Sequence, residues 1–490
     1  MPDLFQHIFK DWSQQHWLVW GFGLLSMLLC WIAIATGFYP IVLLPIALIV
    51  LYVGIVNFRA LFYLLIICVP LSTEIVLPNG FGTDLPTEPL MIGLMLIGVL
   101  YFIQKGPKVD LSFLLHPISL LLLLHLFWIY VTTLSSNLFF VSLKFSLAKT
   151  WYLAVFYFLA AYLLKNLKQQ KLFLWLLFVP LLFTVAVTMV RHAGYGFSFV
   201  GIHKVLHPFQ RNHVNYAAML AYVLPFVWFT WHRFPKWSRV WWFLLGSIAL
   251  MVVAVYLSFT RAAYLALLIA VGTYFIFKWK LIRYALLGAL VAVVIGAAYL
   301  VRHNQYLEYA PNYDRTVTHY EFDNLVEATY NLEDISTMER LYRWVAALNM
   351  SPEEPWVGFG PGNFINFYES YTLNTFRTYV SHNPERSGIH NYFLMILVDQ
   401  GIIGLLLFLV FSAFLLIKGE QIYHQTQGQA RKGVVMACLL ALVVIYAFLI
   451  INDLLETDKV GSIYLVCIAI LVQTDLYNQK ELRAYSKIYP

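Results

Sequence analysis

Residues 433–451 read GVVMACLLALVVIYAFLII, an apolar run that contains no charged side chain. A run of about 20 apolar residues, folded as a helix, is long enough to cross the ~30 Å hydrocarbon core of a membrane. A helix is the form expected there, because lipid offers no hydrogen-bond partner to an exposed backbone amide. This stretch therefore predicts a membrane-spanning helix.

Similar runs recur along the whole chain. Hydrophobic residues make up 61% of the 490 residues and charged residues 12%, whereas a soluble domain carries roughly 25% charged residues. The run from His16 to Phe38 is too long for a cleavable signal peptide, and no small-residue cleavage site follows it. We expect an all-α polytopic membrane protein with about fourteen spans. They start near residues 16, 40, 60, 88, 115, 150, 172, 213, 240, 262, 284, 391, 433 and 460.

Positive charge is distributed unevenly between the two sides of the predicted bundle. Alternate loops hold most of the lysines and arginines, which is typical of cytoplasmic loops. Examples are Arg59, Lys105, Lys165, Arg233 and Lys278. With fourteen spans these loops share one side with both termini, although one short pair of spans could instead be re-entrant. The net charge of +7 therefore indicates membrane topology and not nucleic-acid binding.

The cysteines do not predict a metal site. The chain has four, Cys30, Cys68, Cys438 and Cys467, and all fall inside predicted spans. None has a zinc-binding spacing, so we interpret them as packing residues and expect no metal centre.

One segment, 302–389, interrupts the pattern of spans. It divides the chain into membrane helices 1–301 (about eleven spans), the insertion itself, and 390–490, with about three spans and a cytoplasmic tail. The insertion is acidic, and the charge rule places it outside, in the periplasm of a Gram-negative bacterium. A long loop in a compact protein is functional or disordered. Its many aromatic residues argue against disorder.

The insertion has its own local signals. Ser336 and Glu339 have the spacing of a capping box, which predicts a short helix to about Met350, with Arg340 and Trp344 on one face. A glycine-rich turn follows at 358–363. It could form an anion-binding nest, but a plain turn is the favoured interpretation.

Three polar sites are expected at the outer membrane boundary. His390 should lie in the first turn of a helix, where the helix dipole favours a neutral imidazole; a histidine bonded to a loop carbonyl is the alternative. Arg261, in a very short connection, could bind a ligand or reach lipid phosphates. The polar run 207–216, with Arg211 and Asn215, could line a cavity or cap a helix.

These residues carry a family resemblance. His390-Asn391, nine residues, Gly401, two residues and Gly404 match the H-N-x9-G-x-x-G signature of the O-antigen ligase and O-antigen polymerase superfamily. Arg340 and Trp344 with residues 355–364 look like the family's loop, and Ser258-x-x-Arg261 is similar to one of its turns. The stretch 211–215 departs from the acidic or Asn-Pro-Asn-like pattern of many relatives, which leaves the role of Arg211 open.

The resemblance implies a function. Members resemble metal-independent inverting glycosyltransferases that need no cofactor and use undecaprenyl-pyrophosphate-linked glycans at the periplasmic face of the inner membrane. The acceptor is lipid A–core in a ligase, a growing glycan in a polymerase, or a protein hydroxyl in an O-oligosaccharyltransferase. Ligase is the leading interpretation.

By motif, His390 would be the general base, and Arg261 and Arg340 would bind the pyrophosphate. Arg211 would be a third phosphate ligand or an acceptor contact. A supporting group would consist of Asn391, Trp344, Asn215, Gly401 and Gly404. The two glycines would allow close packing against a neighbouring helix.

A transporter of lipid-linked glycans is the alternative from another class. A carrier should place ionisable residues at mid-membrane depth and show paired repeats. The predicted spans are almost free of charge, and the polar residues gather at one face. This pattern favours surface chemistry on a lipid-borne substrate.

Overall fold

The protein is described by a computed structural model of the whole chain. It describes residues 12–37, 41–42, 44–76, 82–106, 111–302, 334–377, 381–383 and 387–488. Most of the predicted capping-box helix and its flanking turn fall in these ranges. The first part of the predicted insertion, 303–333, lies outside them.

The described residues are almost entirely helical, as predicted. Thirteen helical segments are long and apolar enough to cross a membrane, which agrees with an all-α polytopic protein. The first group is α2 (Trp12–Thr36), α3 (Leu44–Cys68), α4 (Thr87–Lys105), α5 (Pro117–Leu134), α6 (Phe139–Tyr152) continued by η4 (Leu153–Leu159) and α7 (Ala160–Leu163), and α8 (Leu167–Ala193). The second is α10 (His213–Trp231), α11 (Arg239–Tyr256), α12 (Arg261–Lys278), α13 (Ile282–Val301), α17 (Tyr392–Gln425), α18 (Gln429–Leu449) and α19 (Asp458–Ile488).

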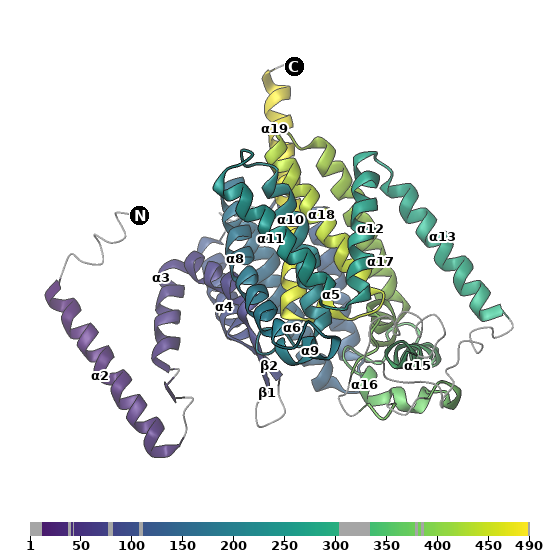
Figure 1. Cartoon of the computed structure of the whole chain (residues 1–490), viewed down its shortest axis with the longest axis horizontal. Coiled ribbons are helices and arrows are strands. Elements are labelled where there is room, and N and C mark those ends of the chain that lie inside the picture. Colours follow the sequence, from purple (N-terminus) through teal and green to yellow (C-terminus); the bar gives the residue numbers. More distant parts are fainter. Residues whose placement is uncertain are drawn as a thin grey trace.

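The spans predicted near residues 40 and 60 form one interrupted helix, α3. Asn57 has non-helical dihedral angles, with φ −150° and ψ 75°, and Figure 1 shows the chain changing direction within α3. The described chain therefore has thirteen candidate spans where fourteen were expected. Two apolar runs joined across a short break cannot be told from two spans by hydropathy alone.

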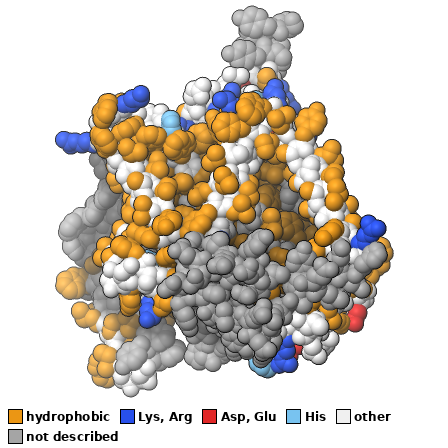
Figure 2. Space-filling view, turned by 45° about the vertical axis from the view of Figure 1, so that its right-hand side comes forward, with side chains coloured by type: hydrophobic (Ala, Val, Ile, Leu, Met, Phe, Trp, Pro, Cys, Tyr) orange, Lys and Arg blue, Asp and Glu red, His pale blue; other side chains and the backbone are white. Residues whose placement is uncertain are grey.

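The centre of the bundle is built by the C-terminal helices. In α18, 83% of the span is buried inside the protein and in α19 78%, against 6% in α2 and in α13. Helix α18 packs against α10 and α12, and Figure 1 shows α2 and α13 at the two margins of the molecule. Figure 2 shows hydrophobic side chains over the flank of the bundle, with most Lys and Arg toward its ends. That surface suits lipid.

Shorter elements lie between the spans. Strands β1 (Thr73–Val76) and β2 (Gly82–Leu85) pair antiparallel, with Thr73 opposite Leu85. The short helices are α9 (Phe199–Val205), α15 (Ile335–Met350) and α16 (Phe364–Phe367), with the turns η2 (Val69–Leu71), η6 (Tyr368–Tyr371), η7 (Asn374–Phe376) and η8 (Leu454–Glu456). Figure 1 shows the hairpin, α9, α15 and α16 at one end of the bundle and the end of α19 at the other.

Candidate active site

His390 immediately precedes a membrane helix. Asn391 is the N-cap of α17, and its side-chain oxygen accepts a hydrogen bond of 3.0 Å from the backbone N–H of Leu394. His390 itself has a left-handed backbone, with φ +56°. The expectation that it lies in the first helical turn is therefore wrong, because Asn391 is a strong N-cap residue and the helix begins after it.

The imidazole of His390 is held in its neutral form. Burial lowers its pKa to about 3, assisted by the positive charges of Arg340, Arg343 and Arg211. Its Nδ1 is buried and has no hydrogen-bond partner among the described residues. The sequence argument pointed to the helix dipole, whereas desolvation and neighbouring arginines are the physical cause here. The imidazole is therefore unprotonated at neutral pH, and the same burial and charges that keep it so also weaken it as a base.

Helix α15 begins at a carboxylate. Asp334 is its N-cap and accepts a 3.0 Å hydrogen bond from the backbone N–H of Thr337. The predicted capping box at Ser336 is therefore displaced by two residues, because the carboxylate of Asp334 occupies the capping position three residues before Thr337. The predicted end of the helix at Met350 is confirmed.

The same carboxylate binds the first predicted arginine. Arg261 is the first residue of α12, and its Nη2 lies 3.1 Å from Oδ2 of Asp334. Burial alone would raise the pKa of Asp334, but the hydrogen bonds from Thr337 and the charge of Arg261 outweigh it and lower the pKa. This ion pair joins helix α15 to the bundle of candidate membrane helices.

The second predicted arginine, Arg340, is the sixth residue of α15. Its Nη1 donates to Ser336 Oγ over 3.0 Å, while its Nε is buried and has no partner among the described residues. Desolvation lowers its pKa to about 10, and the charges of Arg261 and Arg343 add to this effect. Arginines that repel one another at the end of the helices form a site suited to an anion.

Helix α15 also holds the segment that precedes His390. Trp344 Nε1 donates to the carbonyl oxygen of Ile389 over 3.1 Å, and Arg343 Nη1 lies 3.5 Å from that of Gly388. Arg343 is buried and pairs with Glu339 at 3.3 Å. Arg343 had no role in the sequence-based prediction. Its i,i+4 spacing from Glu339 does predict an ion pair on one face of the helix.

The residues of the polar run before α10 have different environments. Asn212 caps the helix through a 2.9 Å hydrogen bond from the backbone N–H of Asn215, so the capping interpretation is confirmed there. Arg211 is exposed, and its Nε lies 3.5 Å from Oε2 of Glu74 in β1. Asn215 is buried, and its Oδ1 has no partner among the described residues.

The glycine-rich turn does form a nest, but a side chain of the same protein fills it. The backbone N–H of Gly362 donates to Asp399 Oδ2 over 2.9 Å, and that of Gly360 donates to the Asp399 carbonyl over 3.0 Å. Asp399 is buried in α17. Gly358, Gly360 and Gly362 all have positive φ, which glycine adopts without a steric penalty. The turn is therefore a structural clamp and not an external phosphate site.

The signature glycines meet different neighbours. Gly401 breaks α17 with φ +68° and ψ −174°, and a Cβ there would lie 2.2 Å from the backbone carbonyl carbon of Trp356. The close contact is with the loop, so the expectation of helix packing is wrong for Gly401. A Cβ on Gly404 would lie 2.4 Å from Cβ of Gln400 in α17 itself and 3.2 Å from the Trp128 ring of α5, so packing against the neighbouring helix accounts for only part of the constraint.

Two carboxylates near the histidine segment escaped sequence analysis. Asp453 Oδ2 lies 2.5 Å from where a Cβ on Gly388 would stand, and burial followed by the charge of Glu456 raises the pKa of Asp453. Glu456 pairs with Lys149 at 2.7 Å. Their signal was the acidic composition of the short loop between α18 and α19. No group of three or more His, Cys, Asp or Glu in the described ranges is placed to hold a metal ion.

Residues 246–409 match a family model described as O-antigen ligase. No curated protein matches the chain. The matched segment runs from α11 into α17 and contains Arg261, Arg340 and His390, whereas Arg211 and Asn215 precede it. Residues 246–409 of this multi-span chain are thus similar to the O-antigen ligase family.

Proposed function

We propose that the protein transfers a glycan from undecaprenyl pyrophosphate to an acceptor hydroxyl at the periplasmic face of the inner membrane. The acceptor is a sugar of lipid A–core, which makes the protein an O-antigen ligase. The observation that supports this best is the position of His390 before α17, with a buried Nδ1 that has no partner among the described residues and with Arg340, Arg343 and Arg211 nearby. The nearness of this histidine to three arginines supports a site for a base and an anionic, lipid-borne pyrophosphate.

His390 acts as the general base. It takes the proton of the acceptor hydroxyl as the acceptor oxygen bonds to the anomeric carbon of the donor sugar. The bond from that carbon to the pyrophosphate oxygen breaks, and undecaprenyl pyrophosphate leaves with the electron pair. A general base contributes roughly 10²–10⁴-fold to such a rate, and attack opposite the leaving group inverts the configuration.

Arg261 and Arg340 bind the pyrophosphate. A guanidinium offers five N–H donors in a fixed fork and binds phosphate oxygens bidentately. Two of them offset the charge that grows on the leaving group. Trp344 and Arg343 support the base by holding the carbonyls of Ile389 and Gly388. In this mechanism arginines supply the positive charge, and no step needs a metal ion.

A deletion strain tests the proposal and separates it from the alternatives. We expect loss of glycan from lipid A–core, with long glycan chains accumulating on the undecaprenyl carrier. Single unextended repeats on the carrier would indicate a polymerase. A lost protein glycan would indicate an O-oligosaccharyltransferase. Carrier-linked glycan confined to the cytoplasmic leaflet would indicate a transporter. Each of these three results would overturn the ligase assignment.

A further inference from the structure

A large cavity lies apart from the arginine cluster. Its volume is about 610 Å³, within the range of roughly 300–1,000 Å³ typical of small-molecule sites. It is bounded by α4, the segment before α5, the π-helix η4 with α7, and the C-terminal part of α19. That end of α19 lies at the end of the bundle opposite α15 in Figure 1, so the cavity is distant from the arginine cluster.

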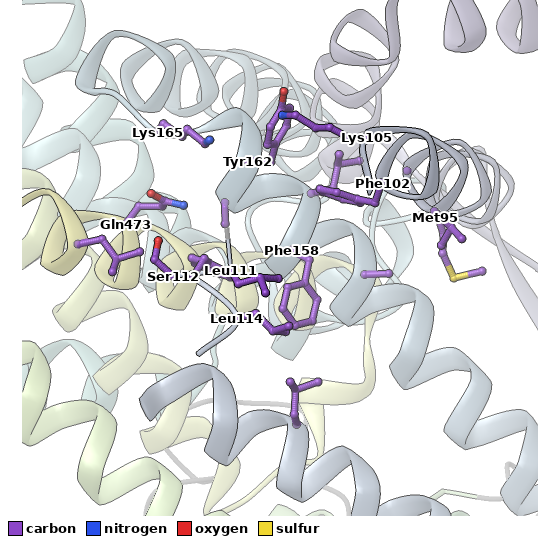
Figure 3. A pocket seen from close by; sticks show the side chains of 18 of the residues that line it. Met95, Phe102, Lys105, Leu111, Ser112, Leu114, Phe158, Tyr162, Lys165 and Gln473 are labelled. Atoms are coloured by element: carbon purple, nitrogen blue, oxygen red, sulfur yellow. The ribbon is translucent and has the colours of Figure 1, made fainter. Parts of the chain in front are cut away.

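The wall and the mouth of the cavity differ in chemistry. The wall is apolar; it includes Leu94, Met95, Val99, Phe102, Leu114 and Phe158. Three lysines, Lys105, Lys165 and Lys480, also line it. Figure 3 shows Lys105, Tyr162 and Lys165 toward one end of the cavity, with Phe158 and Leu114 further in. No carboxylate occurs among the described lining residues.

Two of these lysines approach the same aromatic ring. The ammonium nitrogens of Lys105 and Lys165 lie 4.9 Å and 4.7 Å from the centre of the Tyr162 ring. The Tyr162 hydroxyl is 2.7 Å from that of Tyr101. Two ammonium groups near one ring, with no carboxylate among the described lining residues, favour an anion over a cation. The tyrosine hydroxyls add hydrogen-bonding groups for oxygen atoms.

We infer that this cavity binds one anionic phospholipid, with the phosphate headgroup at Lys105 and Lys165 and an acyl chain along the apolar wall. Charge complementarity carries the choice of occupant, since the wall suits a hydrocarbon chain and the lysines suit a phosphate. The lysines belong to the positively charged end of the bundle, and anionic lipids are the anions concentrated at a cytoplasmic leaflet. The site is independent of glycan transfer.

The experiment uses the full chain reconstituted in phosphatidylcholine vesicles that contain a phosphatidylglycerol probe with a photoreactive acyl chain. We expect cross-links to map to α4, η4 and α19. Lys105→Gln with Lys165→Gln should lower the labelling affinity roughly 10- to 30-fold, because each basic group near the membrane contributes on the order of 1 kcal/mol. Lys168→Gln with Lys278→Gln, which changes two exposed lysines outside the cavity, should not.

A second pair of variants tests the acyl-chain site. Gly98 lines the cavity and has open space around a built Cβ, so Gly98→Leu should fill the cavity and reduce labelling at least tenfold. Gly93, on the same helix, also has open space but does not line the cavity, so Gly93→Leu should label normally. The proposal is overturned by equal labelling of all variants or by equal labelling with a phosphatidylcholine probe. It is also overturned if polyprenyl monophosphate displaces the probe and unlabelled phosphatidylglycerol does not.

Discussion

The guanidinium of Arg261 lies 3.1 Å from the carboxylate of Asp334, although the two residues are 73 positions apart in the chain. Arg261 begins helix α12, a candidate membrane span, and Asp334 caps helix α15. This contact brings Arg261 close to Arg340, whose pKa is lowered by burial and further by the charge of Arg261. The geometry of the proposed pyrophosphate site therefore depends on a helix cap.

Replacing either arginine by lysine should weaken donor binding. Arg261→Lys and Arg340→Lys keep the charge but lose the bidentate fork, and a hydrogen bond to a charged group contributes about 1.5–3 kcal/mol. We expect the Kd for undecaprenyl pyrophosphate to rise roughly 10- to 100-fold in reconstituted protein. Arg377→Lys, an exposed arginine of the same outer segment, is the control. Unchanged binding in both variants would remove the arginines from the pyrophosphate site.

Removing the proposed base should affect the chemical step and not donor binding. His390→Ala should leave the protein folded and membrane-inserted but lower kcat by roughly 10²–10⁴-fold, the range for a general base. The Kd for undecaprenyl pyrophosphate should stay within about threefold, because the arginines remain. His382→Ala, a histidine elsewhere in the outer segment, should behave like wild type. Near-normal transfer by His390→Ala would show that the histidine is only structural.

The pH dependence follows from the lowered pKa of His390. A group whose pKa falls from 6.5 to about 3 in the folded protein stays neutral as pH decreases, until the pH approaches that lower value. The kcat/KM profile reports the free enzyme. We expect it to stay flat on the acidic side from about pH 7 to about pH 5. A fall in kcat/KM on the acidic side with its midpoint near pH 6.5 would contradict a buried, neutral histidine. The acceptor's own ionisation, measured separately, must not account for that fall.

Chelation should not abolish transfer. The arginine cluster supplies positive charge for the leaving group, and the described residues contain no group of three or more metal-type ligands. We therefore expect full activity of purified, lipid-reconstituted protein in EDTA. A loss of activity that added Mg²⁺ or Mn²⁺ restores would falsify the two-arginine mechanism. Asp453 and Glu456 would then be the first carboxylates to test as ligands.

Membrane orientation can be tested by labelling. Glu354→Cys is exposed beside α15, and Gln427→Cys is exposed between α17 and α18. Since the positive loops predict the cytoplasmic side, an impermeant thiol reagent added from outside should modify Cys at 354 and spare Cys at 427. Wild-type protein measures the background from the four native cysteines. Labelling at 427 alone would invert the proposed topology.

Part of the candidate site could be read from the sequence because its signals are local. His390 and Asn391 precede an apolar run, so their place at a membrane boundary follows from position alone. The exact first residue of α17 could not be predicted, because His390 and Asn391 are adjacent polar residues and either could occupy the capping position. Arg261 and Arg340 were found by motif, but their proximity depends on Asp334, whose contact with Arg261 spans 73 residues.

The sequence by itself determined the class of protein and its helical spans. Residues 433–451 have no alternative to burial in lipid or protein, and α18 covers nearly the same stretch, Gln429–Leu449. Only the tertiary structure decided what fills the glycine-rich nest, where α17 breaks, and why His390 is neutral. Asp399 in the nest, Trp356 against Gly401 and the arginines beside His390 all meet their partners across long stretches of chain. Hydropathy is a property of consecutive residues, whereas desolvation and charge depend on what folding brings together from elsewhere in the chain.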